Sequence, residues 1–400
     1  MSGLSKMVLR PPKFTLFDLC GSGCVFNSKV PDNAASWSFP DRSVADAVTG
    51  NQLAVLGEVT VLCSAGVANH AGLELLREIG FDINPEIIAY TDDTDRINCM
   101  KSLAERGFIF IDQHVQPDAR RRPGRTWVES SVLSFLNNKG NLHHVVPAPY
   151  LPLRERCESS LLSRHARRRG HLPVVIKAVT DFSCGSGIGI RICAKDEDID
   201  LAQAYFSECD NVIIEDYLSM EKNLCVNYAV FPEGRIEYIG AAQQILKSDS
   251  EYLGNWLEPD VNVPVQLVET GLHVMAKAWH MGYRGFAGFD AAVFEGGSFY
   301  IYDLNFRFNG STAPLLLYDA LVEYTQLSVA KYAVWKYTGR FSQMITALER
   351  ALERFQFVPI SIYDPGDNKD ARPQVRAMLF GASREEVAEK EKDIAALGFY

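Results

Sequence analysis

The 400-residue chain lacks the features of membrane, secreted and nucleic-acid-binding proteins. No run reaches the roughly 18 apolar residues of a membrane span, and residues 1–13 contain no apolar signal-peptide core. Lys and Arg number 40 against 50 Asp and Glu, so no basic field exists to attract nucleic acid or anionic lipid. The nine cysteines are odd in number and show no C-x-x-C spacing typical of zinc or redox sites. We therefore expect a cytoplasmic protein acting on small molecules, with no nucleic acid and no membrane as partner.

The pattern along the first third of the chain indicates an α/β domain. Hydrophobic residues make up 47% and charged residues 22% of the chain, which excludes disorder and predicts two or three globular domains. Residues 14–19, 58–63 and 108–112 are short apolar runs typical of strands, and residues 71–79 and 95–106 have helical spacing. We predict a sheet-and-helix domain over residues 1–133.

Strand patterns dominate the middle of the chain. Residues 172–177 and 188–193 predict a hairpin, and further strand and helix signals lie at 211–218, 224–231, 236–245, 265–279, 286–294 and 298–305. The tail predicts a strand at 374–380 and a capped helix at 383–397. We place a second domain at residues 134–345, with a lid subdomain at about 172–215, and a small C-terminal segment at 346–400. The fold class is α/β (α+β).

A lysine and a glycine-rich loop form the first candidate site. Lys177 ends a predicted strand, and residues 181–189 follow with glycines that let backbone N–H groups approach an anion closely. Together they suit the phosphates of a nucleoside triphosphate. A flexible hairpin tip would show the same composition, so that interpretation stays open. The loop is not a Walker A motif, because the G-K-[ST] ending is absent.

Oxygen-bearing side chains gather on two adjacent predicted strands. Alternation places Asp303, Asn305 and Arg307 on one face, and a hairpin brings Asp290 opposite them. Mg²⁺ prefers such hard oxygen ligands and completes its shell with water and substrate phosphates. The alternative is a solvent-facing polar surface with no ligand.

In this order, the motifs resemble the ATP-grasp superfamily of carboxylate ligases over residues 137–317. The resemblance implies ATP and Mg²⁺, with Asp290, Asp303 and Asn305 as metal ligands. It implies that ATP is bound by Lys139, Lys177, the loop residues Ser183, Gly185, Ser186 and Gly187, and the linker residues Glu215, Tyr217 and Leu218. Glu221 is the candidate ribose ligand, while Asn223 matches the strand pattern better.

A closer likeness is to ATP-grasp amide and peptide ligases with an N-terminal pre-ATP-grasp domain, a group that includes enzymes of peptide natural-product biosynthesis. Residues 305–312 (NFRFNGST) are similar to their signature, and 243–244 and 252–255 to their substrate loop. The resemblance implies that ATP phosphorylates the carboxylate of an amino acid or small peptide, and that an amine attacks the acyl phosphate, releasing ADP and phosphate. Lys177 and Arg307 are the predicted catalytic residues, and the predicted substrate residues are Gln243, Asn255, Arg307, Gly310, Ser311 and Thr312.

Two other functions remain compatible with these patterns. A nucleotide-binding regulatory protein could keep the fold without turnover, although the intact metal set argues against it. Another ATP-grasp carboxylate-activating enzyme, using a thiol or carboxyphosphate, is the third alternative, and no biotin or thiol-carrier segment supports it. We also expect a homodimer, although no sequence motif indicates one.

Overall fold

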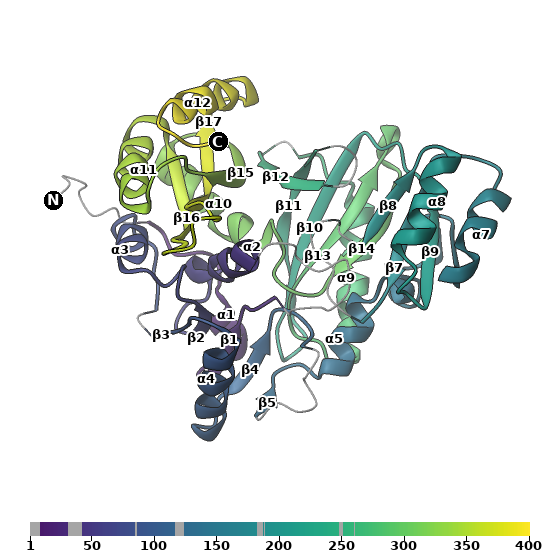
Figure 1. The fold of residues 1–400 in the computed structure, drawn as a ribbon, viewed down its shortest axis with the longest axis horizontal. Helices are drawn as coiled ribbons and strands as arrows, with labels where there is room; N and C mark the ends of the chain where they lie inside the picture. Colours follow the sequence, from purple (N-terminus) through teal and green to yellow (C-terminus); the bar gives the residue numbers. More distant parts are fainter. Residues whose placement is uncertain are drawn as a thin grey trace.

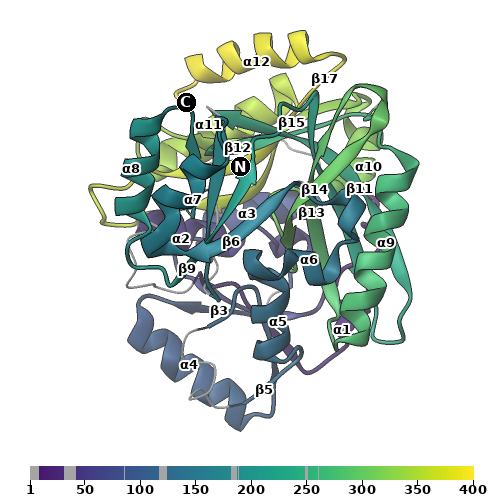
Figure 2. The ribbon, with the colours of Figure 1, turned by 90° about the vertical axis from the view of Figure 1, so that its right-hand side faces the viewer.

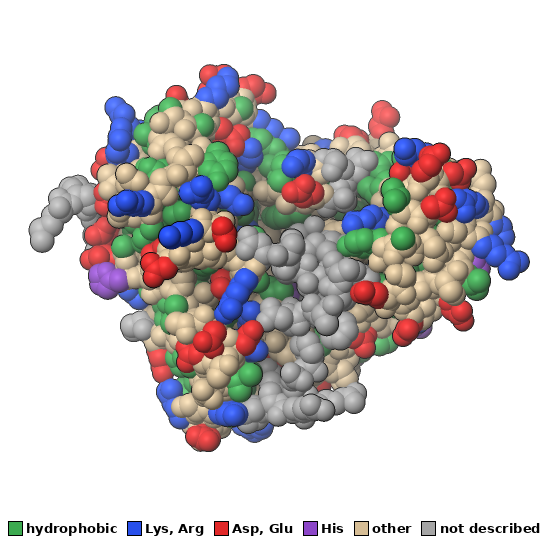
Figure 3. Space-filling view, viewed as in Figure 1, with side chains coloured by type: hydrophobic (Ala, Val, Ile, Leu, Met, Phe, Trp, Pro, Cys, Tyr) green, Lys and Arg blue, Asp and Glu red, His purple; other side chains and the backbone are tan. Residues whose placement is uncertain are grey.

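The computed structural model describes residues 9–30, 42–84, 86–116, 124–181, 187, 189–247, 251–259 and 261–400. Within them, helices flank three β-sheets, and the lid lies at the opposite side of the molecule from the C-terminal helices (Figure 1). Positive and negative side chains intermingle over the face shown in Figure 3. No helix of the described segments has both the length and the apolar character needed to cross a membrane.

The N-terminal sheet is parallel, with strand order β3-β2-β1-β4-β5. Its strands are β1 (Cys24–Asn27), β2 (Thr60–Ser64), β3 (Ile87–Tyr90), β4 (Ile109–Asp112) and β5 (Arg125–Thr126). The helices of this part are α1 (Leu16–Cys20), α2 (Arg42–Ala47), α3 (His70–Glu78) and α4 (Asp93–Glu105). The strand predicted at 14–19 is wrong: Asp18 accepts a hydrogen bond from the Thr15 N–H at 2.6 Å, and this cap starts α1.

The lid is a four-stranded antiparallel sheet in the order β6-β9-β7-β8. It consists of β6 (Arg154–Glu158), β7 (Val174–Val179), β8 (Ile190–Cys193) and β9 (Asn211–Asp216), covered by α7 (Leu162–Arg168) and α8 (Asp196–Tyr205). The predicted hairpin is confirmed by the pairing of β7 with β8. Two helices precede the lid, α5 (Ser130–Asn137) and α6 (Leu142–Val145).

An eight-stranded antiparallel sheet forms the centre, in the order β14-β13-β10-β11-β12-β15-β17-β16. Five of its strands belong to the middle of the chain, namely β10 (Lys222–Val230), β11 (Ile236–Lys247), β12 (Glu251–Leu257), β13 (Gly285–Val293) and β14 (Phe299–Asn305). Helix α9 (Val265–His280) packs on it, with Leu267, Gly271 and Met275 buried. A side chain at Gly271 would collide with the Tyr228 hydroxyl, so glycine allows α9 to approach β10 closely.

The C-terminal residues extend this same sheet. Beyond α10 (Thr312–Thr325), they add β15 (Val329–Lys336), β16 (Phe357–Tyr363) and β17 (Gln374–Gly381), covered by α11 (Phe341–Phe355) and α12 (Arg384–Ala396). Figure 2 shows α12 above this end of the sheet and α4 at the far end of the molecule. The N-terminal and C-terminal parts share one hydrophobic core, and Asn69 donates a hydrogen bond to the Ile362 carbonyl at 3.2 Å. The domain boundaries at 133 and 345 stay predictions.

Candidate active site

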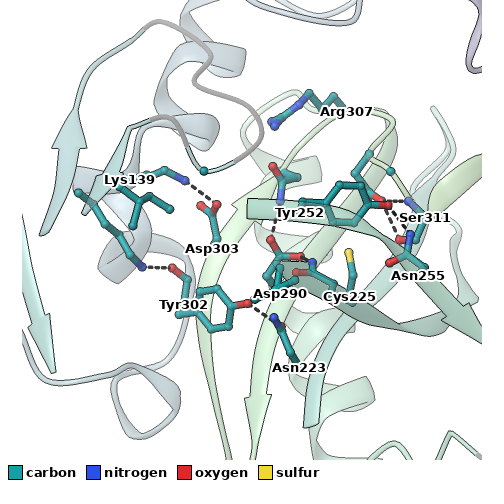
Figure 4. Close-up of a pocket in the computed structure, with 18 of the residues that line it drawn as sticks. Lys139, Asn223, Cys225, Tyr252, Asn255, Asp290, Tyr302, Asp303, Arg307 and Ser311 are labelled. Carbon is teal, nitrogen blue, oxygen red and sulfur yellow. Dashed lines mark hydrogen bonds and ion pairs between the residues drawn. The ribbon is translucent and has the colours of Figure 1, made fainter. Parts of the chain in front are cut away.

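A cavity of about 310 Å³ lies where the three sheets face one another. The lid contributes Val175 and Glu215, the central sheet contributes Asp290 and Asn255, and Gln113, just after β4, comes from the N-terminal part. Figure 4 shows Lys139, Asp303, Asp290 and Arg307 converging on this space. The cavity therefore collects residues that are far apart in the sequence.

Two lysines reach the cavity, and each is paired with an acid. Lys139, on a short 3-10 turn (Lys139–Asn141), forms an ion pair with Asp303. Lys177 forms an ion pair with Glu215 and donates a hydrogen bond to the Tyr302 carbonyl at 2.8 Å. Lys177 and Glu215 are both buried. Incoming phosphate oxygens would find two preplaced cations, with acids as their present partners.

Arg154, which the sequence interpretation missed, links the turn that carries Lys139 to Glu215, the acid that pairs with Lys177. Its guanidinium donates to the Lys139 carbonyl at 2.6 Å and lies 3.4 Å from the Glu215 carboxylate. Burial lowers the pKa of Arg154, and the charge of Glu215 counteracts that effect. Arg154 therefore helps to fix the position of Lys139 directly, and that of Lys177 through Glu215.

The two aspartates face each other across neighbouring strands. Asp290 on β13 is directly opposite Asp303 on β14, as predicted. Burial and the charge of Asp303 raise the pKa of Asp290 to about 6. Burial also opposes ionisation of Asp303, but Lys139 and Lys177 outweigh it and hold the Asp303 pKa below its usual range. The site thus stabilises the ionised form of Asp303 and destabilises the ionised form of Asp290.

The surroundings of this pair fit a hard cation. Asp290 accepts hydrogen bonds from the Gln244 amide at 2.7 Å and the Asn305 amide at 3.2 Å. Two carboxylates and an amide are typical Mg²⁺ ligands, and rotating the Asn305 amide would present its oxygen. Among the described residues, no group of three or more His, Cys, Asp and Glu could hold a metal by itself, so phosphate and water would supply the other ligands.

Replacing Asp290 by Asn should stabilise the protein without ligands at neutral pH. An acid whose pKa is raised from 3.8 to about 6 by folding destabilises the folded state increasingly above pH 3.8 and fully above pH 6. The gain should be on the order of 3 kcal/mol at pH 7.5 and should vanish only toward about pH 3, where wild-type Asp290 is largely protonated in both states. Thermal unfolding in EDTA between about pH 3 and pH 8 measures it. Asp367→Asn, at an exposed position, is the matched control. Equal stability of wild type and Asp290→Asn at pH 7.5 would contradict the assignment.

The stretch after β9 borders the cavity, but not with every predicted residue. Glu215, Tyr217 and Leu218 line it, together with Asn223. Glu221, the predicted ribose ligand, does not line this cavity and instead borders a separate cleft beside α9. Glu221 precedes β10, whereas Asn223 lies on that strand, lines the cavity and accepts a hydrogen bond from the Tyr302 hydroxyl at 2.6 Å.

The predicted phosphate loop lies largely outside the described residues. This applies to Ser183, Gly185 and Ser186. Gly187, at the foot of β8, is described and lines the cavity, and its φ of 77° is a conformation that favours glycine. Gly187 and Lys177 of β7 therefore border the same cavity.

The segment after β14 brings most of the predicted substrate residues into the cavity. Arg307, Gly310 and Ser311 line it, as does Asn255 on β12. The Arg307 guanidinium donates to the Asn137 amide oxygen at 3.0 Å. A side chain at Gly310 would collide with Tyr252, so only glycine lets the loop pass there.

Two predicted substrate residues do not reach the cavity. Thr312 is fully buried, and its hydroxyl donates to the Asn227 amide oxygen at 2.8 Å, which fixes the start of α10. Gln243 lies on the outward face of β11 and accepts a hydrogen bond from Arg384 at 2.7 Å. Its neighbour Gln244 faces inward and contacts Asp290. The Gln-Gln pair gave no signal to decide which side chain points inward.

Several cavity residues could not be found from local pattern. Asn51, Gln52 and His114 come from the N-terminal part, and Arg376 comes from β17. Burial and the charge of Arg307 lower the pKa of His114 to about 3, so this imidazole is neutral. Long-range packing brings these residues together, and no local motif marks them.

The fold is that of ATP-grasp enzymes. The ADP complex of N5-carboxyaminoimidazole ribonucleotide synthetase matches with a TM-score of 0.62 at 14% identity, over 97% of this chain and 98% of that one. Its Staphylococcus aureus counterpart with ADP gives 0.59 at 11% identity, over 98% and 99%. Biotin carboxylase from Campylobacter jejuni gives 0.58 at 11% identity, over 94% and 92%. Identities this low establish a shared fold only.

Two family models identify the group more closely. The model of the L-aspartate–L-methionine ligase ATP-grasp domain matches residues 152–305, and the model of the N-terminal domain of the same ligase matches residues 15–134. The matches together cover more than half of the chain. The chain therefore belongs to this family of ATP-grasp ligases, which form carbon–nitrogen bonds with ATP. The predicted resemblance, including the distinct N-terminal domain, is confirmed.

Proposed function

We propose that the enzyme joins a carboxylate of L-aspartate to the amino group of L-methionine, with Mg²⁺ bound by Asp290, Asp303 and Asn305. The match of both the N-terminal and the ATP-grasp family models to one ligase carries this proposal. The regulatory alternative is less well supported, because the cavity holds both lysines and both acids in one place.

The nucleotide would lie between the lid and the central sheet. Val175, Ile190, Ile192 and Leu246 offer apolar surface to adenine, and Glu215 to Leu218 border the same end of the cavity. Lys139 and Lys177 would take the phosphates, releasing their present partners Asp303 and Glu215. Asp303 then becomes available to Mg²⁺, which supplies charge neutralisation at the transferring phosphoryl group.

Chemistry would proceed in two steps. A carboxylate oxygen of aspartate attacks the γ-phosphorus, the bond to ADP breaks, and an acyl phosphate forms. The amine of methionine then attacks the acyl carbon, phosphate leaves with the bonding electrons, and the amine loses its proton. Arg307 would face the reacting carboxylate, where its planar guanidinium can hold two oxygens at once. The protein's share is positioning and charge stabilisation.

The products distinguish this mechanism from adenylation. With ATP, Mg²⁺, L-aspartate and L-methionine, we expect one ADP, one phosphate and one aspartyl-methionine per turnover, measured by chromatography and mass spectrometry. Each amino acid alone should release little phosphate, because the second step needs both. Stoichiometric AMP and pyrophosphate would exclude the acyl phosphate route. ADP without dipeptide would point to different substrates, to be sought by a pairwise amino-acid screen. The expected cytoplasmic location, homodimer and role in natural-product biosynthesis stay predictions.

A further inference from the structure

Arg376 differs from the two cavity lysines because no acid neutralises it. Lys139 and Lys177 each pair with a carboxylate inside the cavity. Arg376 lines the same cavity, yet within the described part of the chain no carboxylate lies within 4.0 Å of its guanidinium. The buried Tyr332 is near enough for the charge of Arg376 to counteract part of the rise that burial causes in the Tyr332 pKa. An arginine placed in this way is available to an anionic ligand.

The same end of the cavity has hydrogen-bond acceptors without donors. The side-chain oxygens of Asn51, Gln52 and Asn255 are buried and have no hydrogen-bond partner among the described residues. All three residues line the cavity. Buried acceptors without partners are rare in native proteins and call for a donor. A ligand with N–H groups would satisfy them.

The register of the central sheet brings these features together. Arg376 on β17 is paired with Ser361 on β16, so their side chains share a face. Gly50 packs directly against Ser361, because a Cβ at Gly50 would lie 2.6 Å from the Ser361 hydroxyl oxygen. Asn51 and Gln52 follow Gly50 in the chain and are therefore close to the sheet face that carries Ser361 and Arg376. Asn255 is paired with Tyr332 on the other side of Arg376. The unpaired arginine and the unpartnered oxygens therefore surround one corner of the cavity.

We propose that this corner, formed by Arg376, Asn51, Gln52 and Asn255, binds the amine-bearing substrate as an amino acid. Its carboxylate would pair with Arg376, and its amino group would donate to the amide oxygens. This inference rests on the proposed ligase function and adds the residues that select the amine. Of these four residues, only Arg376 lies outside the family-model matches, which cover residues 15–134 and 152–305.

The position of Arg376 in the sheet favours the amine substrate over the acyl donor. Arg376 lies on β17, whereas Asp290 and Asp303 lie on β13 and β14 near the other end of the central sheet. All three residues line the same cavity. The carboxylate that is phosphorylated would bind beside the two aspartates, which leaves Arg376 to the second substrate. The chemistry of the corner agrees, because neutral amide oxygens accept from an amine without the strong preference for the ammonium form that a carboxylate would impose.

The test compares L-methionine with L-methioninamide, which keeps the amine and lacks the carboxylate. In wild type, kcat/KM should be at least about a hundredfold higher for methionine. Arg376→Gln should lower kcat/KM for methionine about a hundredfold and leave that for methioninamide nearly unchanged, with KM for ATP and aspartate unaffected. Arg372→Gln, at an exposed position of the same segment, should keep the wild-type preference.

The outcomes separate this inference from the proposed function. Wild type that uses methioninamide as well as methionine overturns the role of Arg376 without any variant, even if Arg376→Gln fails to fold. Equal losses on both amines, or a change confined to KM for aspartate, also overturn it. Absence of dipeptide in wild type instead contradicts the proposed substrates. The comparison is then made with the amino acid that the pairwise screen identifies and with its amide.

Discussion

Lys177→Met should lower kcat/KM at least about a thousandfold, because it removes a cavity cation that we propose neutralises the transferring phosphoryl group. The KM for ATP should rise as well. Phosphate release with saturating aspartate and methionine measures the loss. Lys195→Met, at an exposed position of the lid, is the matched control and should retain activity.

The structure adds a stability effect that the sequence did not indicate. A lysine at a strand end suggests little structural role, yet Lys177 is buried against Glu215. Among the described residues, its removal leaves Glu215 paired only with Arg154, at 3.4 Å. The free energy of unfolding should therefore fall by about 3 kcal/mol. The double variant Lys177→Met with Glu215→Gln should recover most of this stability and none of the activity. Recovery of activity in the double variant would show that the loss came from folding.

Sequence patterns predicted the central chemistry because it lies on regular strands. The alternation that placed Asp290 opposite Asp303 is realised in the β13–β14 pairing. The strand pattern also favoured Asn223, which lines the cavity, over Glu221, which does not. At Gln243 the resemblance gave no face, and its neighbour Gln244 is the residue that lines the cavity. A strand's facing cannot be read where polar residues stand on both faces, because a shift of one residue exchanges them.

The remainder of the site depends on tertiary structure. Arg376 and Gln52 have no motif around them, and they reach the cavity because the C-terminal strands extend the central sheet against the N-terminal part. The helix at 16–20 shows the reverse case, where a local cap overrides an apolar run. The strands that carry Asp290 and Asp303 were therefore predictable, while the helix at 16–20 and the contribution of the two ends of the chain to the cavity were not.

Arg307→Lys should lower kcat about a hundredfold and leave thermal stability nearly unchanged. The guanidinium lines the cavity two residues beyond Asn305 and is oriented by the Asn137 amide oxygen at 3.0 Å. A lysine keeps the charge but cannot hold two oxygens of a reacting carboxylate in one plane. Activity assays under saturating substrates and thermal unfolding of the same preparations give both readouts.

A structural role for Arg307 predicts the opposite result. If the arginine only fixes the segment after β14 to α5, its hydrogen bond to Asn137 is what matters for stability and activity. The guanidinium nitrogens that face the cavity should then contribute little. Asn137 also accepts a hydrogen bond from the Phe306 N–H at 3.0 Å, so Asn137→Ala removes the anchor while keeping the arginine. We expect Asn137→Ala to lose stability and retain more activity than Arg307→Lys. An Arg307→Lys enzyme that unfolds early, or that keeps full activity, would remove Arg307 from the reaction, because only a substrate-facing guanidinium separates kcat from stability in this way.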